Sequence, residues 1–385
     1  MHEHMRVMVS NPEDIEQVLR DLRSASLPRA DRGAPLVRAT VLNLVAYAER
    51  QTLAEQMGHW MADLAEQHPA RAVIMHPEPA PGAGDLQIWV EAHCHPTLAG
   101  HLVCYEEVQV AARGPVIERL PALVLSLLLR DLPVVLWWPG DLPVGTTLFD
   151  RLMASSDRLV ADSASATRPT ELLRRLVALG HAEHCQCMIR DLNWGRLTPW
   201  RELTAQFFDP PDSRPYLERL DHVRIELTSA PERPDMAQPY LLAAWLATRL
   251  GWMPGPVPWT EVPGGAQLNL RRGQEPVVVE IESMPDEEPG SQGLSCLELS
   301  AHTATGEAAF TIQRSEDGRR ATVSTVLPGG ERRQRVVPFP VLTPLDLMSE
   351  ELSRSGHDAP FDEALRMAAF FSAQNSLARH SMVSM

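Results

Sequence analysis

The sequence contains no lysine, so all 35 of its basic residues are arginine. Without lysine the chain cannot form a Schiff base and cannot use a lysine as a general base. It also cannot build a P-loop, because the lysine of that loop contacts the nucleotide phosphates. One missing residue type therefore excludes three common kinds of site. We attribute the arginine bias itself to genomic composition.

Positive charge is also scarce. The 35 basic residues face 50 acidic ones, which gives a formal net charge of -15 at pH 7. A nucleic-acid partner needs clustered basic side chains that neutralise its phosphates, and an anionic membrane surface attracts the same charge. We therefore expect neither nucleic acid nor a membrane as a partner.

Long apolar runs and secretion signals are missing as well. The most hydrophobic window, 120–139, is interrupted by Arg130, Asp131 and two prolines, and its apolar runs fall short of the roughly 20 residues that span a bilayer. Residues 1–5 lack the basic and apolar regions of a secretory signal. Five cysteines are an odd number for so long a chain, which fits a reducing compartment. These observations predict a cytoplasmic location.

Most catalytic signatures are absent from the sequence. It has no GxSxG and no HExxH motif. The segment Gly82-Ala83-Gly84 lacks the third glycine of the dinucleotide fingerprint and precedes a predicted strand instead of a helix. We predict a loop there, and we expect no cofactor.

Length and composition predict two folded domains. The chain has 385 residues, more than one core usually organises, and its 44% hydrophobic and 22% charged content is ordinary for a folded protein. We place the domains at 1–190 and 191–385.

The first half alternates short apolar strands with helices, which is typical of an α/β domain. Some of these strands are joined too closely for crossovers, so we expect a mixed sheet covered by helices. The predicted strands cover 35–47, 72–75, 86–92, 102–112, 134–138 and 158–160. One predicted helix starts near Asn11, and the others cover 52–67, 114–129, 148–154 and 170–179.

The second half has a different pattern of elements, because its predicted strands mostly follow one another without a helix between them. Asp317-Gly318 is a strong hairpin signal, and Gly329-Gly330 marks another turn. We predict an α+β domain with an antiparallel meander and C-terminal helices. The predicted strands cover 223–227, 268–271, 277–281, 296–302, 308–313 and 321–326. The predicted helices cover 199–208, 240–250, 344–353 and 361–371.

Metal-ligating residue types form one dense cluster. Its members are His181, His184, Cys185 and Cys187. Imidazole and thiolate groups suit zinc, but natural sites usually divide their ligands into two separated pairs. We favour exposed helix-end residues and keep zinc as the alternative. A second set of the same residue types is His93, Cys94, His95, His101 and Cys104.

Two further features suggest a site without defining one. Asp157 and Asp162 flank a predicted strand and could form a carboxylate pair, although surface or capping roles are the favoured interpretation.

Adjacent tryptophans, Trp137 and Trp138, end a predicted core strand, and neighbouring strand residues point to opposite faces. The tryptophans and arginines near residue 200 are of the types most enriched at interaction hot spots. Burial in a sheet covered on both faces is the alternative for Trp137 and Trp138.

Four segments, in this order, resemble the OpcA-type assembly proteins of glucose-6-phosphate dehydrogenase. They are HPAR at 68–71, LPVVLWWP at 132–139, ASSDRLVADS at 154–163 and DLNWGRLTPWR at 191–201. Residues 240–251 also resemble a helix of the second domain of that family. The resemblance implies a non-catalytic partner that binds glucose-6-phosphate dehydrogenase and promotes its active oligomer in the oxidative pentose phosphate pathway.

The resemblance also selects candidate residues for partner binding. They are His68, Arg71, Trp137, Trp138, Asp191, Trp194, Arg196, Trp200 and Arg201. An alternative hypothesis is a sugar-phosphate enzyme or sensor, in which Arg71, Arg196 and Arg201 would hold the phosphate through bidentate pairs.

Overall fold

The computed structural model divides the chain into two compact units. It describes residues 6–26, 40–65, 67–82, 84–96, 102–181, 187–229, 236–285, 293–304, 306–330 and 332–383. Unit 1 comprises Met1–Asp162, Gly180–Asp191 and Pro344–Ser355. Unit 2 comprises Ser163–Leu179, Leu192–Thr343 and Gly356–Met385. The division at 190/191 into two sequential domains stays a prediction.

Unit 1 is built on a mixed eight-stranded sheet, here sheet A, in the order β1-β4-β5-β3-β2-β6-β7-β8. The six strands from β5 to β8 in this order run parallel, β4 pairs antiparallel with β5, and β1 pairs antiparallel with β4. The strands are β1 (Val7–Val9), β2 (Leu42–Tyr47), β3 (Ala70–Glu78), β4 (Asp85–Pro96), β5 (Leu102–Arg113), β6 (Val134–Pro139), β7 (Arg158–Asp162) and β8 (Met188–Asp191). Continuous burial along β2, β6 and β7 is what a parallel sheet covered on both faces requires.

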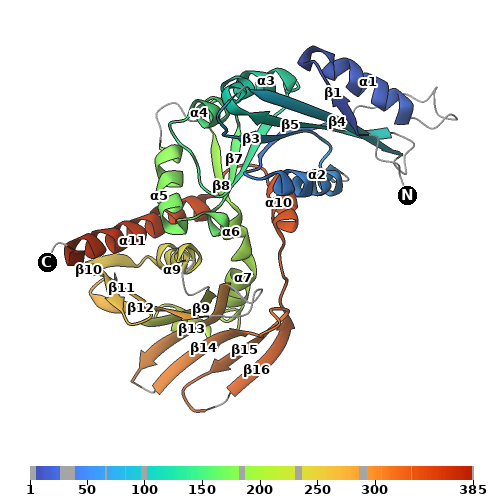
Figure 1. Ribbon diagram of the computed structural model, residues 1–385. Helices are drawn as coiled ribbons and strands as arrows, with labels where there is room; N and C mark the ends of the chain where they lie inside the picture. The colour runs from blue at the N-terminus through green and yellow to red at the C-terminus, as the bar shows by residue number, and fades with distance from the viewer. Residues whose placement is uncertain are drawn as a thin grey trace. The chain divides into compact units, whose positions relative to one another are not determined.

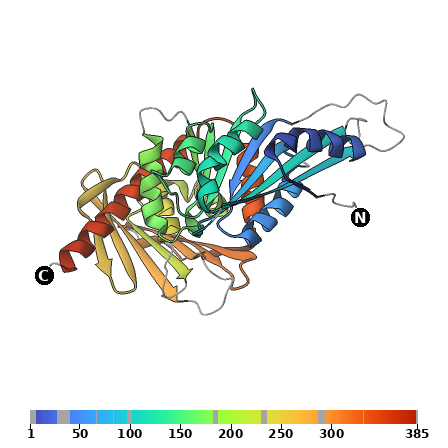
Figure 2. The ribbon, with the colours of Figure 1, turned by 45° about the horizontal axis from the view of Figure 1, so that its top comes forward.

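Helices cover both faces of sheet A, with α2 and α10 on one side and α1, α3 and α4 on the other (Figure 1). Trp137 is 1% exposed and stacks on Trp60 of α2, whereas Trp138 is fully buried and meets Phe149 of α4 edge-on. Figure 2 shows α1 lying across the strands. The helices are η1 (Pro12–Asp14), α1 (Ile15–Ser26), α2 (Gln51–Ala65), η2 (Gly114–Arg119), α3 (Leu120–Leu127), α4 (Thr147–Met153) and α10 (Pro344–Ser353).

Unit 2 is built on a second eight-stranded sheet, sheet B, in the order β10-β11-β12-β9-β13-β14-β15-β16. All neighbours are antiparallel except β9 and β12, so the meander is interrupted by one parallel pair. The strands are β9 (His222–Ser229), β10 (Met253–Val262), β11 (Gly265–Arg272), β12 (Glu275–Pro285), β13 (Gly293–Thr303), β14 (Gly306–Arg314), β15 (Arg320–Val326) and β16 (Arg332–Pro338).

One face of sheet B is buried under helices. Val277, Val279 and Ile281 alternate along β12 and are fully buried, while the residues between them are half-buried. In Figure 1, α9 and α11 lie over this sheet. Gly251 at φ 67° ends α9 in the left-handed conformation. The helices are η3 (Ser163–Ser165), α5 (Pro169–Gly180), α6 (Leu192–Arg196), α7 (Thr198–Gln206), α8 (Arg214–Leu217), α9 (Ala237–Leu250) and α11 (Ala359–Val383).

The predicted fold class, an α/β domain followed by a strand-rich α+β domain, is confirmed. The predicted turns at 317–318 and 329–330 join β14 to β15 and β15 to β16. Of the strand predicted over 35–47, residues 35–39 lie outside the described residues, and β2 begins at Leu42. The strands β1, β8, β10 and β16 were not predicted from the sequence. The helix predicted at 170–179 belongs by its contacts mainly to unit 2. Among the described residues, no helix combines the length and hydrophobicity that crossing a membrane demands.

Candidate functional site

The parallel strands of sheet A have the order of the dinucleotide-binding fold. Numbered along the chain, β5-β3-β2-β6-β7-β8 reads 3-2-1-4-5-6. In such sheets ligands bind at the carboxyl ends of the strands where the order reverses. Here that position lies at the ends of β2 and β6, so this edge is where the fold would place a cofactor.

The residues at this edge do not fit a dinucleotide. The connection from β2 to α2 is Ala48-Glu49-Arg50, and it contains no glycine. A dinucleotide needs glycines there because its pyrophosphate approaches the backbone closely, and Glu49 would repel that anion. The ring of Tyr47 stacks on Trp138 with 4.0 Å between centroids and 3° between planes. Two aromatic side chains therefore lie together at the strand ends where the fingerprint glycines would be expected.

A groove of about 420 Å³ lies beside α2, and we call it the α2 groove. Its lining comes from α2, β3, β4 and β5 together with Arg6. The polar and aromatic members of the lining are Arg6, Gln51, Glu55, His76, Glu78, Asp85, Gln87, Trp89, Gln109 and Arg113. The groove lies at the carboxyl ends of β3 and β5, and this is the edge of the sheet at which open α/β folds bind ligands.

Hydrogen bonds order the floor of the α2 groove. Arg6 donates from Nη2 to Oε1 of Gln109 at 2.6 Å, and its guanidinium lies 4.9 Å from the ring centre of Trp89. Gln109 in turn donates to Glu107 at 2.5 Å. Glu107 also accepts from Tyr105, and burial raises its pKa above the usual range for a carboxyl. A carboxyl group whose ionised form burial disfavours is therefore hydrogen-bonded to Gln109 of the groove lining.

Arg71, a candidate from the resemblance, is only 1% exposed. It donates from Nε to Oε2 of Glu106 at 2.8 Å and from Nη1 to the carbonyl of Leu127 at 3.0 Å, and it pairs with Glu16. The guanidinium is therefore engaged by two carboxylates and a backbone carbonyl. Arg71 lies in unit 1 whereas Arg196 and Arg201 lie in unit 2. The sugar-phosphate hypothesis stays a prediction, and no contact of Arg71 favours it.

His68 helps to hold α10 in unit 1. Its Nε2 lies 3.4 Å from the hydroxyl oxygens of both Ser349 and Ser353. Burial lowers the pKa of His68, and its contact with Ser349 acts in the opposite direction. The HPAR segment thus joins the end of α2 to a helix that is distant in the sequence.

The end of α10 is held by two buried arginines, here called the α10 anchor. Arg158 donates to the carbonyl of Glu351 at 2.5 Å and to that of Arg354 at 2.9 Å, while Nε of Arg190 lies 3.0 Å from the carboxylate of Glu351. Cations at a helix C-terminus are favourable because the last carbonyls carry partial negative charge. Burial lowers the pKa of Arg158, and Glu351 acts against that shift.

In unit 2, Trp194 connects the DLNWGRLTPWR segment to the start of α11. It donates from Nε1 to Asp358 at 3.2 Å and packs on Phe361. Arg201 lies 3.5 Å above the indole of Trp194 and donates to the Trp194 carbonyl at 3.1 Å.

The remaining candidates are mostly interior as well. Trp200 is 3% exposed and packs on Phe339, Asp191 is buried, and Arg196 is half-buried. The tryptophans of these motifs therefore support the two units from inside. Their assignment to partner binding stays a prediction.

The two metal hypotheses gain no support from the described part of the chain. No group of three or more candidate ligands comes together among the residues that the structure describes. His181 and Cys187 belong to that part, whereas His184 and Cys185 lie outside it. Of the second set, His101 lies outside the described residues. The register of β4 and β5 places Cys94 opposite Cys104.

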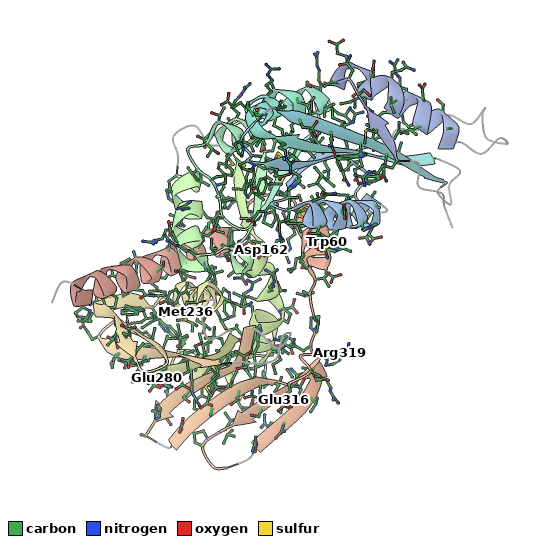
Figure 3. All side chains as sticks on the ribbon, viewed as in Figure 1. Trp60, Asp162, Met236, Glu280, Glu316 and Arg319 are labelled. Carbon is green, nitrogen blue, oxygen red and sulfur yellow. The ribbon has the colours of Figure 1, made fainter. Side chains whose placement is uncertain are left out.

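Asp157 and Asp162 do not form a carboxylate pair across a site. They stand at opposite ends of β7, five residues apart, and a strand rises about 3.3 Å per residue. Asp157 is exposed and accepts a hydrogen bond from the backbone of Val134, the first residue of β6, at 2.7 Å. Asp162, labelled in Figure 3, is 2% exposed at the end of its strand.

Several residues that shape the two units were not identified as candidates from the sequence. Tyr47 carried a signal, because this aromatic residue directly precedes the turn that a dinucleotide fold needs to be rich in glycine. Asn193 and Gln238 form a buried chain of amides in unit 2, in which Asn193 donates to Ser163 at 3.0 Å and Gln238 donates to Asn193 at 3.2 Å. No spacing links Asn193 to Gln238, so their pairing could not be foreseen.

Comparisons with known proteins agree with the resemblance. Residues 61–178 match the family described as glucose-6-phosphate dehydrogenase subunit N-terminal domain, and residues 187–365 match the corresponding C-terminal domain family. A protein described as putative OxPP cycle protein OpcA from Synechocystis is 29% identical over 338 residues, covering 84% of this chain and 68% of the relative. Its counterpart from Synechococcus elongatus is 30% identical over 315 residues, covering 80% of this chain and 68% of that protein.

Among solved structures, a putative oxidoreductase from Parabacteroides merdae is similar in fold. It has a TM-score of 0.51 and 10% identity, with coverage of 89% of this chain and 99% of that one. At this identity the likeness concerns the fold alone. The two matching domain families and the relatives together show that this chain belongs to the OpcA family of glucose-6-phosphate dehydrogenase assembly proteins.

Proposed function

We propose that the chain is a non-catalytic partner that binds glucose-6-phosphate dehydrogenase and promotes its active oligomeric state. Its family is named for a subunit of that enzyme, and its relatives are named for the oxidative pentose phosphate cycle. The proposed place of action is the cytoplasm.

One observation carries the non-catalytic part of the proposal. Sheet A has the strand order of a dinucleotide-binding fold, yet the turn after β2 lacks glycine, contains Glu49, and is preceded by the stacked pair of Tyr47 and Trp138. A dehydrogenase needs that turn to hold its cofactor. A chain with this architecture and this turn is suited to a role that uses its surfaces instead of a cofactor.

The energetic demand on such an activator is modest. It must bind the active state of the enzyme more tightly than the inactive state, because a ligand shifts an equilibrium only by its differential affinity. A shift of one or two decades needs about 1.4 to 2.8 kcal/mol of differential contact. A few interface side chains can supply that amount.

The direct test is co-purification with the cognate dehydrogenase, followed by rate assays with and without this chain. We expect a stable complex, a change in the oligomer distribution of the enzyme by light scattering, and a higher rate at limiting substrate. A dehydrogenase that neither binds the chain nor changes its rate would refute the proposal. Turnover of a metabolite by the purified chain alone would refute its non-catalytic part.

A further inference from the structure

The α2 groove exists because the chain joins β3 to β5 through a strand. Parallel strands are usually joined by a crossover helix, and a right-handed crossover after β3 would place that helix beside α2. Here β4 instead extends the sheet beyond β5, and β1 adds a short edge strand. The register of β1 and β4 places Met8 directly opposite Trp89. Met8 is 63% exposed and Trp89 is half-buried, so this face keeps apolar side chains at the surface of unit 1.

One carboxylate of the groove lining, Glu55, has no ion pair among the described residues, and a second, Asp85, lies opposite Arg113 and interacts with it electrostatically. Gln51 donates to Glu55 at 3.0 Å, and Gln87 donates to Asp85 at 2.9 Å. The amide partners satisfy part of the hydrogen-bonding capacity of Glu55 and Asp85, but an amide carries no charge that could balance a carboxylate.

The other charged side chains around the groove are paired with each other. Nη2 of Arg113 lies 2.5 Å from Oε1 of Glu78, and Nε of Arg6 lies 3.6 Å from Oε1 of Glu91. The lining therefore has three carboxylates, from Glu55, Glu78 and Asp85, and two guanidinium groups, which gives it a net negative charge. An occupant that complements it must bring hydrogen-bond donors and positive charge.

We propose that the α2 groove receives an arginine or lysine side chain of glucose-6-phosphate dehydrogenase, next to an apolar residue that packs on Met8 and Trp89. This inference rests on the proposed function and names the surface that performs it. Arg6 and Trp89 line the groove and Met8 lies opposite Trp89 on β1, and these three residue types are enriched at protein interfaces. A second copy of this chain is a poorer occupant because its net charge of -15 has the same sign as the groove.

The test compares matched pairs of neutralising substitutions in the full chain. The groove variant carries Glu55→Gln and Asp85→Asn, and the control carries Glu13→Gln and Asp63→Asn, which are exposed residues of the same unit outside the groove lining. We expect the groove variant to bind the cognate dehydrogenase about tenfold more weakly at low salt, with a flatter salt dependence. The control should match the wild type, and unfolding curves should show that both variants are folded.

A crosslinking experiment identifies the occupant. A photo-crosslinking amino acid at Gln87 should form adducts with a dehydrogenase segment that contains arginine or lysine, whereas the same group at Asp63 should not. Unchanged affinity of the groove variant in a system where the wild type binds would overturn the groove assignment and leave the proposed function standing. Self-association that only the groove variant abolishes would assign the groove to a second copy and overturn it as well. Failure of the wild type to bind the dehydrogenase at all would remove both proposals.

Discussion

At the scale of single residues, Glu107 shows how burial changes the chemistry of a carboxyl group. It is 3% exposed and accepts a hydrogen bond from Gln109, a residue of the α2 groove lining. Burial raises its pKa, whereas hydrogen bonds from Tyr105 and Gln109 act in the opposite direction. The folded chain therefore keeps a proton on Glu107 at a pH where the unfolded chain has lost it. Native protein binds more protons in that window, so its stability falls as pH rises from the unfolded pKa through the folded pKa.

Replacing Glu107 by glutamine should remove this pH dependence. The amide stays neutral, and its carbonyl can still accept the hydrogen bond of Tyr105. We expect the free energy of unfolding of Glu107→Gln to increase relative to wild type as pH is raised from about 5 to about 8. Urea unfolding at several pH values measures this difference, with the exposed Asp63→Asn as the control. Wild-type and Glu107→Gln curves that stay parallel across the range would show that Glu107 does not titrate as inferred.

At the scale of elements, α10 depends on residues far from it in the sequence. Glu351 is 7% exposed and lies against Arg158 and Arg190, which belong to β7 and β8. A ten-residue helix is marginal by itself in water, so most of its stability must come from such tertiary contacts. The α10 anchor therefore decides whether this part of the chain is helical.

Removing one arginine of the anchor should loosen α10 selectively. Arg158→Ala deletes the donors to the carbonyls of Glu351 and Arg354, so we expect backbone amides of α10 to exchange about tenfold faster or more. Hydrogen exchange read by mass spectrometry measures this, and strands of sheet B provide an internal reference. Arg354→Ala, which removes only an exposed ion pair with Glu350, should leave the exchange nearly unchanged. Equal exchange in Arg158→Ala and wild type would mean that other contacts hold α10.

At the scale of the whole molecule, the chain combines a dinucleotide-type strand order with a turn that does not fit a dinucleotide. Fold and function separate in this way because strand order depends on the hydrophobic core, whereas cofactor binding depends on a few residues at the strand ends. The residues that resemble the OpcA family are largely interior, and the polar groove beside α2 lies outside those segments. The motifs that identify the family are thus distinct from the surface that we propose for docking.

This separation predicts that the chain does not bind NADP+ or NAD+. In a thermal unfolding experiment, concentrations that stabilise the cognate dehydrogenase should leave the Tm of this chain unchanged. A ligand at 100 times its dissociation constant would stabilise the chain by about 2.7 kcal/mol, which is readily detected. A clear rise in Tm would show that the turn after β2 binds a dinucleotide in a way its residues do not indicate.

The sequence by itself determined the fold class, most elements, two hairpin turns and the family. These are local properties, because the period of apolar residues, the turn chemistry at Asp317-Gly318 and the motif letters can be recognised without knowing what packs against them. The edge strands of the two sheets, β1, β8, β10 and β16, escaped; β16, for example, is exposed along almost its whole length and so has no alternation of buried apolar residues.

Only the tertiary structure decided which residues meet. The stacking of Tyr47 on Trp138, the burial of Arg71 against Glu106 and Glu16, and the return of α10 to unit 1 each join residues far apart in the chain. The α2 groove likewise depends on the register of β1, β4 and β5. Such pairings arise from the packing of whole elements, and neither spacing nor composition in one sequence records them.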